Sequence, residues 1–259
     1  MNDSTTHVAQ FVAPELIPAE LPPPDDELLY DDGEPMETFW HRCAMNLLIE
    51  VVYWLYHDRT DFYVGGNMFL YYSARQARTL EYRGPDFFFV RGVNREPMRK
   101  FWAVWNEGGK YPDLIIELMS PTTAHVDLTV KKVLYESTFH TNNYFCYDPD
   151  GQRLLGWHLV QGKYEPITKT KNGRLWCEEL GLWLGPWKGS YLGYEDVWLR
   201  FFYDDERLAL TATEAARERV EAERRRTEAA EAEVVRLKAL LLEKGSLRRS
   251  GADAGPSAP

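Results

Sequence analysis

The chain has 259 residues, of which 44% are hydrophobic and 14% aromatic, and its formal net charge is −10. This hydrophobic share is enough to build a core, so a wholly disordered chain is excluded. The sequence shows neither an apolar run of about 18 residues nor a secretory signal, which predicts a cytoplasmic protein. The cysteines form no C-x-x-C pair, so we expect buried thiols instead of a disulfide framework or a zinc site: Cys43, Cys146 and Cys177.

The acidic charge is concentrated at the N-terminus. Residues 1–38 contain ten Asp or Glu and no Lys or Arg, whereas residues 39–208 carry 21 acidic and 20 basic residues. Prolines interrupt the acidic segment and its carboxylates repel one another, so residues 1–38 are predicted to form a disordered arm. The arm is interpreted either as a solubilising tail or as a mimic of nucleic acid that covers a basic groove.

The middle of the chain, residues 39–205, alternates helical and strand patterns. Residues 39–57 and 126–139 have the composition and spacing of helices. This alternation predicts an α/β (α+β) domain with a mixed sheet flanked by helices. The runs that predict strands are FYVGGNMFLYY, PDFFFV, FWAVW, PDLIIEL, YFCYD, LLGWHLV, YEPI and LGLWLG.

The C-terminal segment is a predicted helix over residues 209–245. Its central part, residues 213–244, is rich in Ala, Glu, Arg and Leu and contains no Gly or Pro. A seven-residue spacing of small and apolar residues favours a coiled coil between two copies of the chain, and a solvated single helix is the alternative. Residues 246–259 are small and polar, so a disordered tail is expected. The residues of the seven-residue spacing in the predicted helix, which we call the apolar stripe, are Val220, Thr227, Val234 and Leu241, with Ala230 and Leu237 between them.

Two carboxylates stand out in the strand patterns. Side chains alternate across a strand, so Asp113, Ile115 and Glu117 face one side of the run PDLIIEL. Glu117 is thereby placed in an apolar strand, where its burial demands a cation, a metal or hydrogen-bond donors. Asp86 begins the apolar run DFFFV. Two such carboxylates from adjacent strands can hold a hard divalent cation.

A lysine completes the candidate site. Lys131 lies four residues after Asp127 and four before Tyr135, so the three share one helix face. Two carboxylates, Mg²⁺ or Mn²⁺ and a lysine are suited to phosphodiester hydrolysis, with the metal on Asp86 and Glu117 and the lysine beside the phosphate. The alternatives are turn chemistry at the Pro-Asp pairs and an ordinary Asp127–Lys131 helix pair.

The segments GPDFFFV, PDLIIELMSPTTA, DLTVKKVLYES and YFCYDPDGQRLLGWHLVQGKYEPI resemble the Uma-type restriction endonucleases, a family of the PD-(D/E)XK nuclease superfamily. The resemblance covers about residues 35–205. It implies a restriction-endonuclease-like fold, a DNA substrate and a divalent metal on Asp86 and Glu117. The lysine position of the superfamily motif is taken here by Met119, so the resemblance implies that Lys131 replaces it, with Lys132 as the alternative.

One position departs from the resemblance. Relatives often have a Glu before the aromatic pair of the next strand, where this chain has Asn143. A role that this Glu has in relatives is therefore not expected in this chain, whereas the expected metal pair, Asp86 and Glu117, is unaffected. The competing hypothesis is a non-catalytic interaction module that keeps the nuclease fold and assembles through its C-terminal helix.

Overall fold

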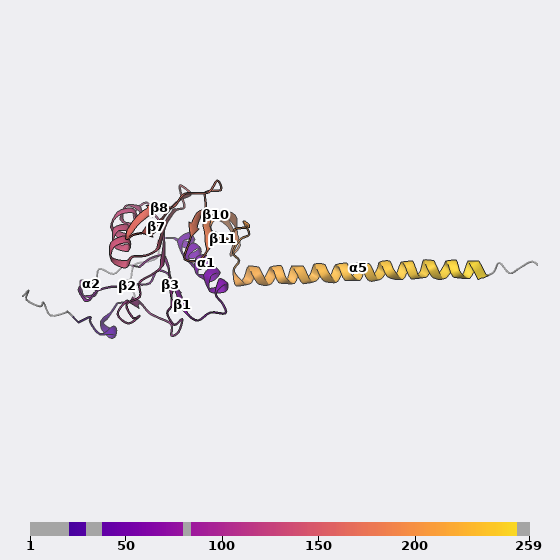
Figure 1. Ribbon diagram of the computed structural model, residues 1–259, viewed down its shortest axis with the longest axis horizontal. Coiled ribbons are helices and arrows are strands. Elements are labelled where there is room, and N and C mark those ends of the chain that lie inside the picture. Colours follow the sequence, from indigo (N-terminus) through magenta and orange to yellow (C-terminus); the bar gives the residue numbers. More distant parts are fainter. Residues whose placement is uncertain (1–20, 30–37, 80–83, 253–259) are drawn as a thin grey trace, which may run out of the picture.

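The computed structural model describes residues 21–29, 38–79 and 84–252 (Figure 1). The predictions for residues 1–20 and 30–37 of the arm, and for residues 253–259 of the tail, lie outside the described residues. Residues 21–29 differ from the prediction of a disordered arm, because they pack on the domain. Leu28 is buried against Phe69 and Tyr71, and the Tyr71 hydroxyl donates to the backbone oxygen of Leu29 at 2.6 Å.

A six-stranded mixed sheet forms the centre of the domain. Its central strands β5 and β6 run parallel, and the other neighbours pair antiparallel. This confirms the predicted mixed sheet. The strands are, in spatial order, β1 (Phe62–Gly65), β3 (Phe87–Arg91), β5 (Leu114–Leu118), β6 (Asn143–Asp148), β7 (Arg153–Val160) and β8 (Lys163–Pro166).

The remaining strands form two smaller sheets. The run predicted as one strand over residues 62–72 is divided, because the chain turns at Gly65, Gly66 and Asn67, and Asn67 adopts a positive φ of 46°. The short helix α2 (Ala74–Arg78) follows the second half. The strands are β2 (Leu70–Tyr71) with β4 (Trp102–Ala103), and β9 (Leu175–Cys177), β10 (Leu182–Tyr191) and β11 (Tyr194–Phe202).

Two helices cover the two faces of the six-stranded sheet (Figure 1). One face packs on α1 (Phe39–Leu55) and the β9–β11 sheet, and the other packs on residues 124–139, which we call the crossover helix. The crossover helix connects the parallel strands β5 and β6, as a parallel pair requires. Its segments are α3 (Ala124–Val126), η2 (Asp127–Lys131), α4 (Lys132–Leu134) and η3 (Tyr135–Phe139), of which η2 and η3 are π-helical.

The predicted alternation along β5 is confirmed by its contacts. Leu114, Ile116 and Leu118 belong to the apolar cluster with α1, whereas Ile115 packs in the cluster of the crossover helix. Glu117 therefore shares the face of Ile115. All three cysteines are free and buried, as predicted.

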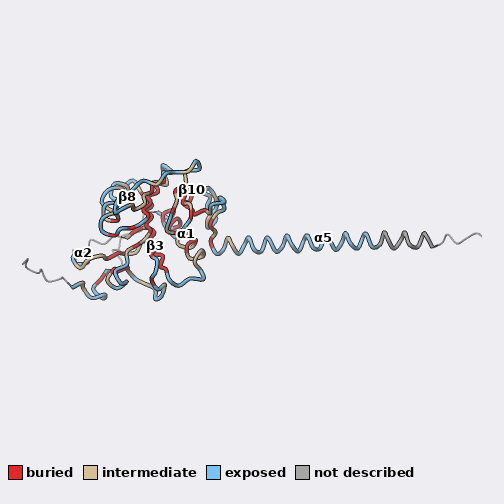
Figure 2. The backbone as a smooth tube through the Cα atoms, in the orientation of Figure 1, coloured by how far each residue is buried: buried red, intermediate tan, exposed pale blue. Residues whose placement is uncertain are grey.

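Helix α5 (Ala212–Ala252) projects from the domain (Figure 1). The residues whose burial is described are mostly exposed (Figure 2), including Val220 at 69% and Leu241 at 69%. The helix continues past the predicted end at residue 245 to Ala252, so residues 246–252 do not form the predicted disordered tail. Gly245 does not end the helix, because a glycine costs a helix only about 1 kcal/mol. Among the described helices, none is long and apolar enough to cross a membrane.

Candidate functional site

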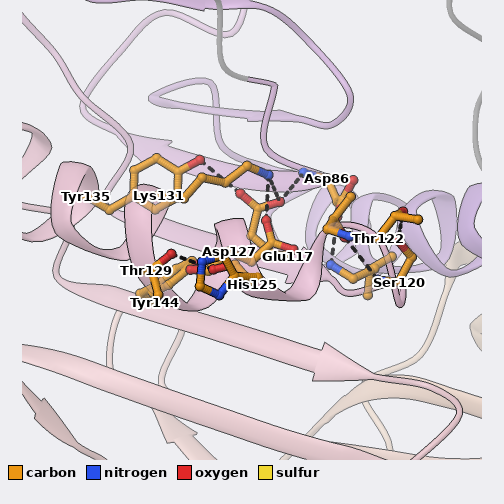
Figure 3. A network of polar contacts seen from close by, with 12 residues as sticks. Asp86, Glu117, Ser120, Thr122, His125, Asp127, Thr129, Lys131, Tyr135 and Tyr144 are labelled. Carbon is orange, nitrogen blue, oxygen red and sulfur yellow. Dashed lines mark hydrogen bonds and ion pairs between the residues drawn. The ribbon is translucent and has the colours of Figure 1, made fainter.

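Glu117 lies at the centre of the sheet and is fully buried. Its side chain points towards the crossover helix (Figure 3). The Tyr135 hydroxyl donates to Glu117 Oε1 at 2.9 Å, and Lys131 Nζ lies 3.0 Å from Oε2. A buried carboxylate is costly without donors, so these two helix side chains compensate its desolvation.

The crossover helix supplies a cluster of polar side chains along one face. Lys131 Nζ contacts Asp127 Oδ1 at 2.8 Å as well as Glu117, and the Asp127 side chain is only 2% exposed. The predicted common face of Asp127, Lys131 and Tyr135 is thus confirmed (Figure 3). Both Lys131 and Tyr135 lie in π-helical turns, an irregularity that is frequent at functional sites.

Lys132 points elsewhere. Its ammonium lies 4.1 Å from the ring centre of Trp157, which is a cation–π contact. Of the two lysines considered from the sequence, the structure therefore brings Lys131 to the buried carboxylate.

Asp86 stands immediately before β3, next to Glu117. Its Oδ2 accepts a hydrogen bond from the backbone N–H of Leu118 at 2.7 Å, and its own backbone nitrogen lies 3.4 Å from Glu117 Oε2. The pairing of β3 with β5 therefore places the two predicted carboxylates side by side.

His41 was not singled out from the sequence. Its Nε2 lies 2.8 Å from Asp86 Oδ1, and the residue comes from α1, which is remote in the chain. The sequence signal for His41 was weak: it is a histidine on the buried face of a helix whose other buried residues, such as Ala44 and Leu48, are apolar.

Asp113 and Asn143 lie away from this group. Asp113 precedes β5, at the opposite end from Glu117, and its Oδ2 accepts from the Arg91 backbone N–H at 2.7 Å. Asn143 pairs with Leu114 at that same end and accepts a hydrogen bond from the Glu179 backbone. Both residues have structural partners there.

Comparison with protein families decides the identity of the chain. The model of the Uma2 family, described as "Putative restriction endonuclease", matches residues 15–186. The chain belongs to the Uma2 family. The matched region contains Asp86, Glu117 and Lys131, whereas α5 lies outside it.

A solved structure is also similar to this Uma2 chain. It is described as a "putative nuclease belonging to DUF820 from Anabaena variabilis ATCC 29413", with 15% sequence identity and a TM-score of 0.41. The match covers 59% of this chain and 82% of that one. No curated protein matches the chain.

Burial shifts the charge balance of the Uma2 site. Desolvation raises the pKa of Glu117 to about 8, despite the opposing effect of the Lys131 ammonium, and Asp86 and Asp127 add to the rise. Burial by itself would lower the pKa of Lys131, but the carboxylates of Glu117 and Asp127 outweigh it and raise that pKa. Lys131 is therefore a cation at neutral pH, while Glu117 holds a proton more readily than a free Glu.

The raised pKa of Glu117 predicts how the stability of the metal-free protein changes with pH. Between about pH 4.5 and 8 the folded state retains a proton that the unfolded state has released, so the free energy of unfolding falls as the pH rises through this window. Urea unfolding of the parent and of Glu117→Gln at pH 5, 6, 7 and 8, with a chelator, measures the slope. The variant loses this contribution; equal slopes for the two proteins would contradict the prediction.

Gly66 lets the chain approach Asp86 closely. A Cβ at this position would lie 2.4 Å from the Asp86 backbone oxygen and 2.8 Å from Met45 Cγ. Gly66→Ala is therefore expected to lower the free energy of unfolding by about 1–3 kcal/mol in urea titrations. Gly84→Ala is the matched control, because its Cβ would come no closer than 3.4 Å, to the Met68 backbone oxygen. Equal stabilities of the two variants would contradict this interpretation.

Asp86 and Glu117 fit a divalent cation. No group of three or more His, Cys, Asp or Glu is placed to hold a metal within the described part of the chain. Two adjacent carboxylates are nevertheless sufficient for Mg²⁺, which retains several water ligands and commonly takes further oxygens from a phosphate. The Asp86 side chain is 18% exposed, so the pair can be reached from solvent on the Asp86 side, whereas Glu117 is fully buried.

Proposed function

We propose that the chain is a metal-dependent DNA endonuclease in which Asp86, Glu117 and Lys131 form the catalytic site. Membership of the Uma2 family supports a nuclease role. The observation that carries the proposal is the position of Lys131 Nζ, 3.0 Å from the buried Glu117 and next to the Asp86 position. This is the lysine and carboxylate combination that phosphodiester hydrolysis uses.

Stability alone does not account for this cluster. A charged group in the interior is costly, and a buried ion pair is often no better for stability than apolar residues of similar volume. Glu117, Asp127 and Lys131 are nevertheless all placed between the central strand and its helix. Buried titratable groups with shifted pKa values are concentrated at functional sites.

Each residue of the cluster has a distinct role in the proposed reaction. Asp86 and Glu117 would hold Mg²⁺ or Mn²⁺, which supplies charge neutralisation and lowers the pKa of a bound water. Lys131 presents its ammonium as a point charge to the scissile phosphate. Tyr135 fixes Glu117 by donating to Oε1, and Asp127 holds Lys131 in place.

Cleavage of supercoiled and linear DNA tests the proposal. With Mg²⁺ or Mn²⁺, purified protein is expected to nick or linearise the plasmid, and a chelator stops the reaction. If no DNA is cleaved and calorimetry detects no metal binding, the proposal is wrong. That outcome would favour the alternative of a non-catalytic nuclease fold that assembles through α5.

We also propose that α5 pairs two copies of the chain. Its apolar stripe is exposed, with Val234 and Leu237 both at 49%. Residues 216–241 are all exposed, and this part of a long helix gains stability by pairing. Sedimentation should detect a dimer of the 30.1 kDa chain, and the double variant Val234→Glu/Leu241→Glu a monomer. Val235→Glu is the matched control, since Val235 is exposed but off the stripe. A monomeric parent protein would refute the pairing.

A further inference from the structure

His41 reaches Asp86 from a different layer of the domain. It lies in the first turn of α1, where Thr38 caps the helix and accepts a hydrogen bond from the His41 backbone N–H at 3.1 Å. The distance from His41 Nε2 to Asp86 Oδ1 is 2.8 Å, and the two side chains are only 11% and 18% exposed. The contact is therefore largely shielded from water.

Two hydrogen bonds hold the Asp86 carboxylate, one on each oxygen. Leu118 N–H donates to Oδ2 at 2.7 Å, and His41 faces Oδ1. The ladder between β3 and β5 begins at Phe87, opposite Ile116, so Asp86 lies just outside it. Its carboxylate is consequently oriented by these two hydrogen bonds, one from a backbone N–H and one from the His41 side chain. Each carboxylate oxygen keeps a further lone pair, which leaves room for a cation.

We propose that His41 is a positioning residue of the metal site. Its Nε2–H donates to Oδ1 and thereby sets the direction in which Asp86 presents its oxygens beside Glu117. The inference rests on the proposed nuclease function. His41 acts through Asp86 and not as a ligand, because the nitrogen that faces the site is already engaged with Oδ1 at 2.8 Å. Partners that orient a metal ligand typically contribute about 10- to 100-fold to metal affinity.

Calorimetric titration with Mn²⁺ alone, without DNA, tests this role. His41→Leu removes the donor and is expected to weaken Mn²⁺ binding about 10- to 100-fold. His41→Gln keeps an N–H at a similar reach and restores most of the affinity. His41→Asn remains polar but is too short, so it behaves like His41→Leu and replaces that variant if the apolar side chain prevents folding. His57→Leu, at an exposed position just after the C-terminal end of α1, is the matched control and binds as the parent does.

The outcomes separate the two proposals. If His41→Leu and His41→Asn bind Mn²⁺ as tightly as the parent, or if His41→Gln loses as much affinity as they do, the positioning role is wrong while the nuclease function stands. If the parent itself binds no Mn²⁺, the metal-dependent function fails and the role of His41 fails with it. A Mn²⁺ affinity that is highest for the parent, lower for His41→Gln and lowest for His41→Asn and His41→Leu supports both the metal site and the positioning role.

Discussion

Replacing Glu117 with Gln or Lys131 with Met should reduce metal-dependent DNA cleavage on the order of 10³-fold. Gln has the shape of Glu and can still accept the hydrogen bond of Tyr135, but it has no charge to hold a divalent cation. Met has nearly the length of Lys but no ammonium for the phosphate. Initial rates of plasmid nicking at saturating Mg²⁺ measure both effects.

Lys132→Met is the matched control for Lys131→Met. The two lysines are adjacent in the crossover helix, but Lys132 lies over Trp157 and not at Glu117. Its substitution is expected to change cleavage by no more than a few-fold. Equal losses in the two lysine variants, or cleavage that survives Glu117→Gln, would mean that the site lies elsewhere.

Glu214→Ala should cost about 3–5 kcal/mol of folding free energy, because it leaves Arg200 buried without its partner. Arg200 is fully buried on β11, and its guanidinium donates to both oxygens of Glu214, at 3.0 and 2.7 Å. Glu214 also accepts from the backbone N–H of Thr211 at 2.7 Å, and Thr211 Oγ1 accepts from that of Glu214. This reciprocal capping box starts α5.

Urea unfolding of the domain measures the cost at Glu214. Glu218→Ala is the control, since Glu218 is exposed one turn further along α5, and it should change stability by less than about 0.5 kcal/mol. The double variant Arg200→Met/Glu214→Met should recover most of the loss, because it removes both charges. A Glu214→Ala protein as stable as the Glu218→Ala protein would show that the pair contributes nothing.

The same pair predicts an acid sensitivity. Burial would raise the pKa of Glu214, but the hydrogen bonds from Arg200 and Thr211 outweigh it and lower that pKa. The stabilisation is therefore present above the ordinary Glu pKa of 4.5 and is lost as the pH falls through the lowered value. The stability of Glu214→Ala should accordingly decline less at low pH than that of the parent.

Local patterns were sufficient to predict the sheet around Glu117. The strict alternation of a strand placed Glu117 on the side of Ile115, and the four-residue spacing grouped Asp127 with Lys131. These rules depend only on backbone geometry. That Asp86 lies beside Glu117 could be predicted only from the family resemblance or from the order of the strands in the sheet, because strand pairing is set by long-range packing.

Other features could not be predicted from local patterns. His41 reaches Asp86 across 45 positions of sequence, a separation that no periodicity encodes. The strand β11 was missed because its polar beginning, Tyr194–Glu195–Asp196, hides the apolar part that packs against α1. The burial of Leu28 was also missed, and the residue was assigned to a disordered arm. The apolar site that buries it is formed by Tyr71 and its neighbours, which are distant in the sequence.

The π-helical turns of the crossover helix determine which changes this segment tolerates. Each residue turns the following ones by about 100° in an α-helix and by less in a wider π-helical turn. The insertion or loss of one residue between Lys131 and Tyr135 would therefore rotate one contact of Glu117 away from the other. Substitutions on the outer side, at Val130 or Val133, leave the spacing intact. The length of the crossover helix is thus more strictly constrained than its outward-facing composition.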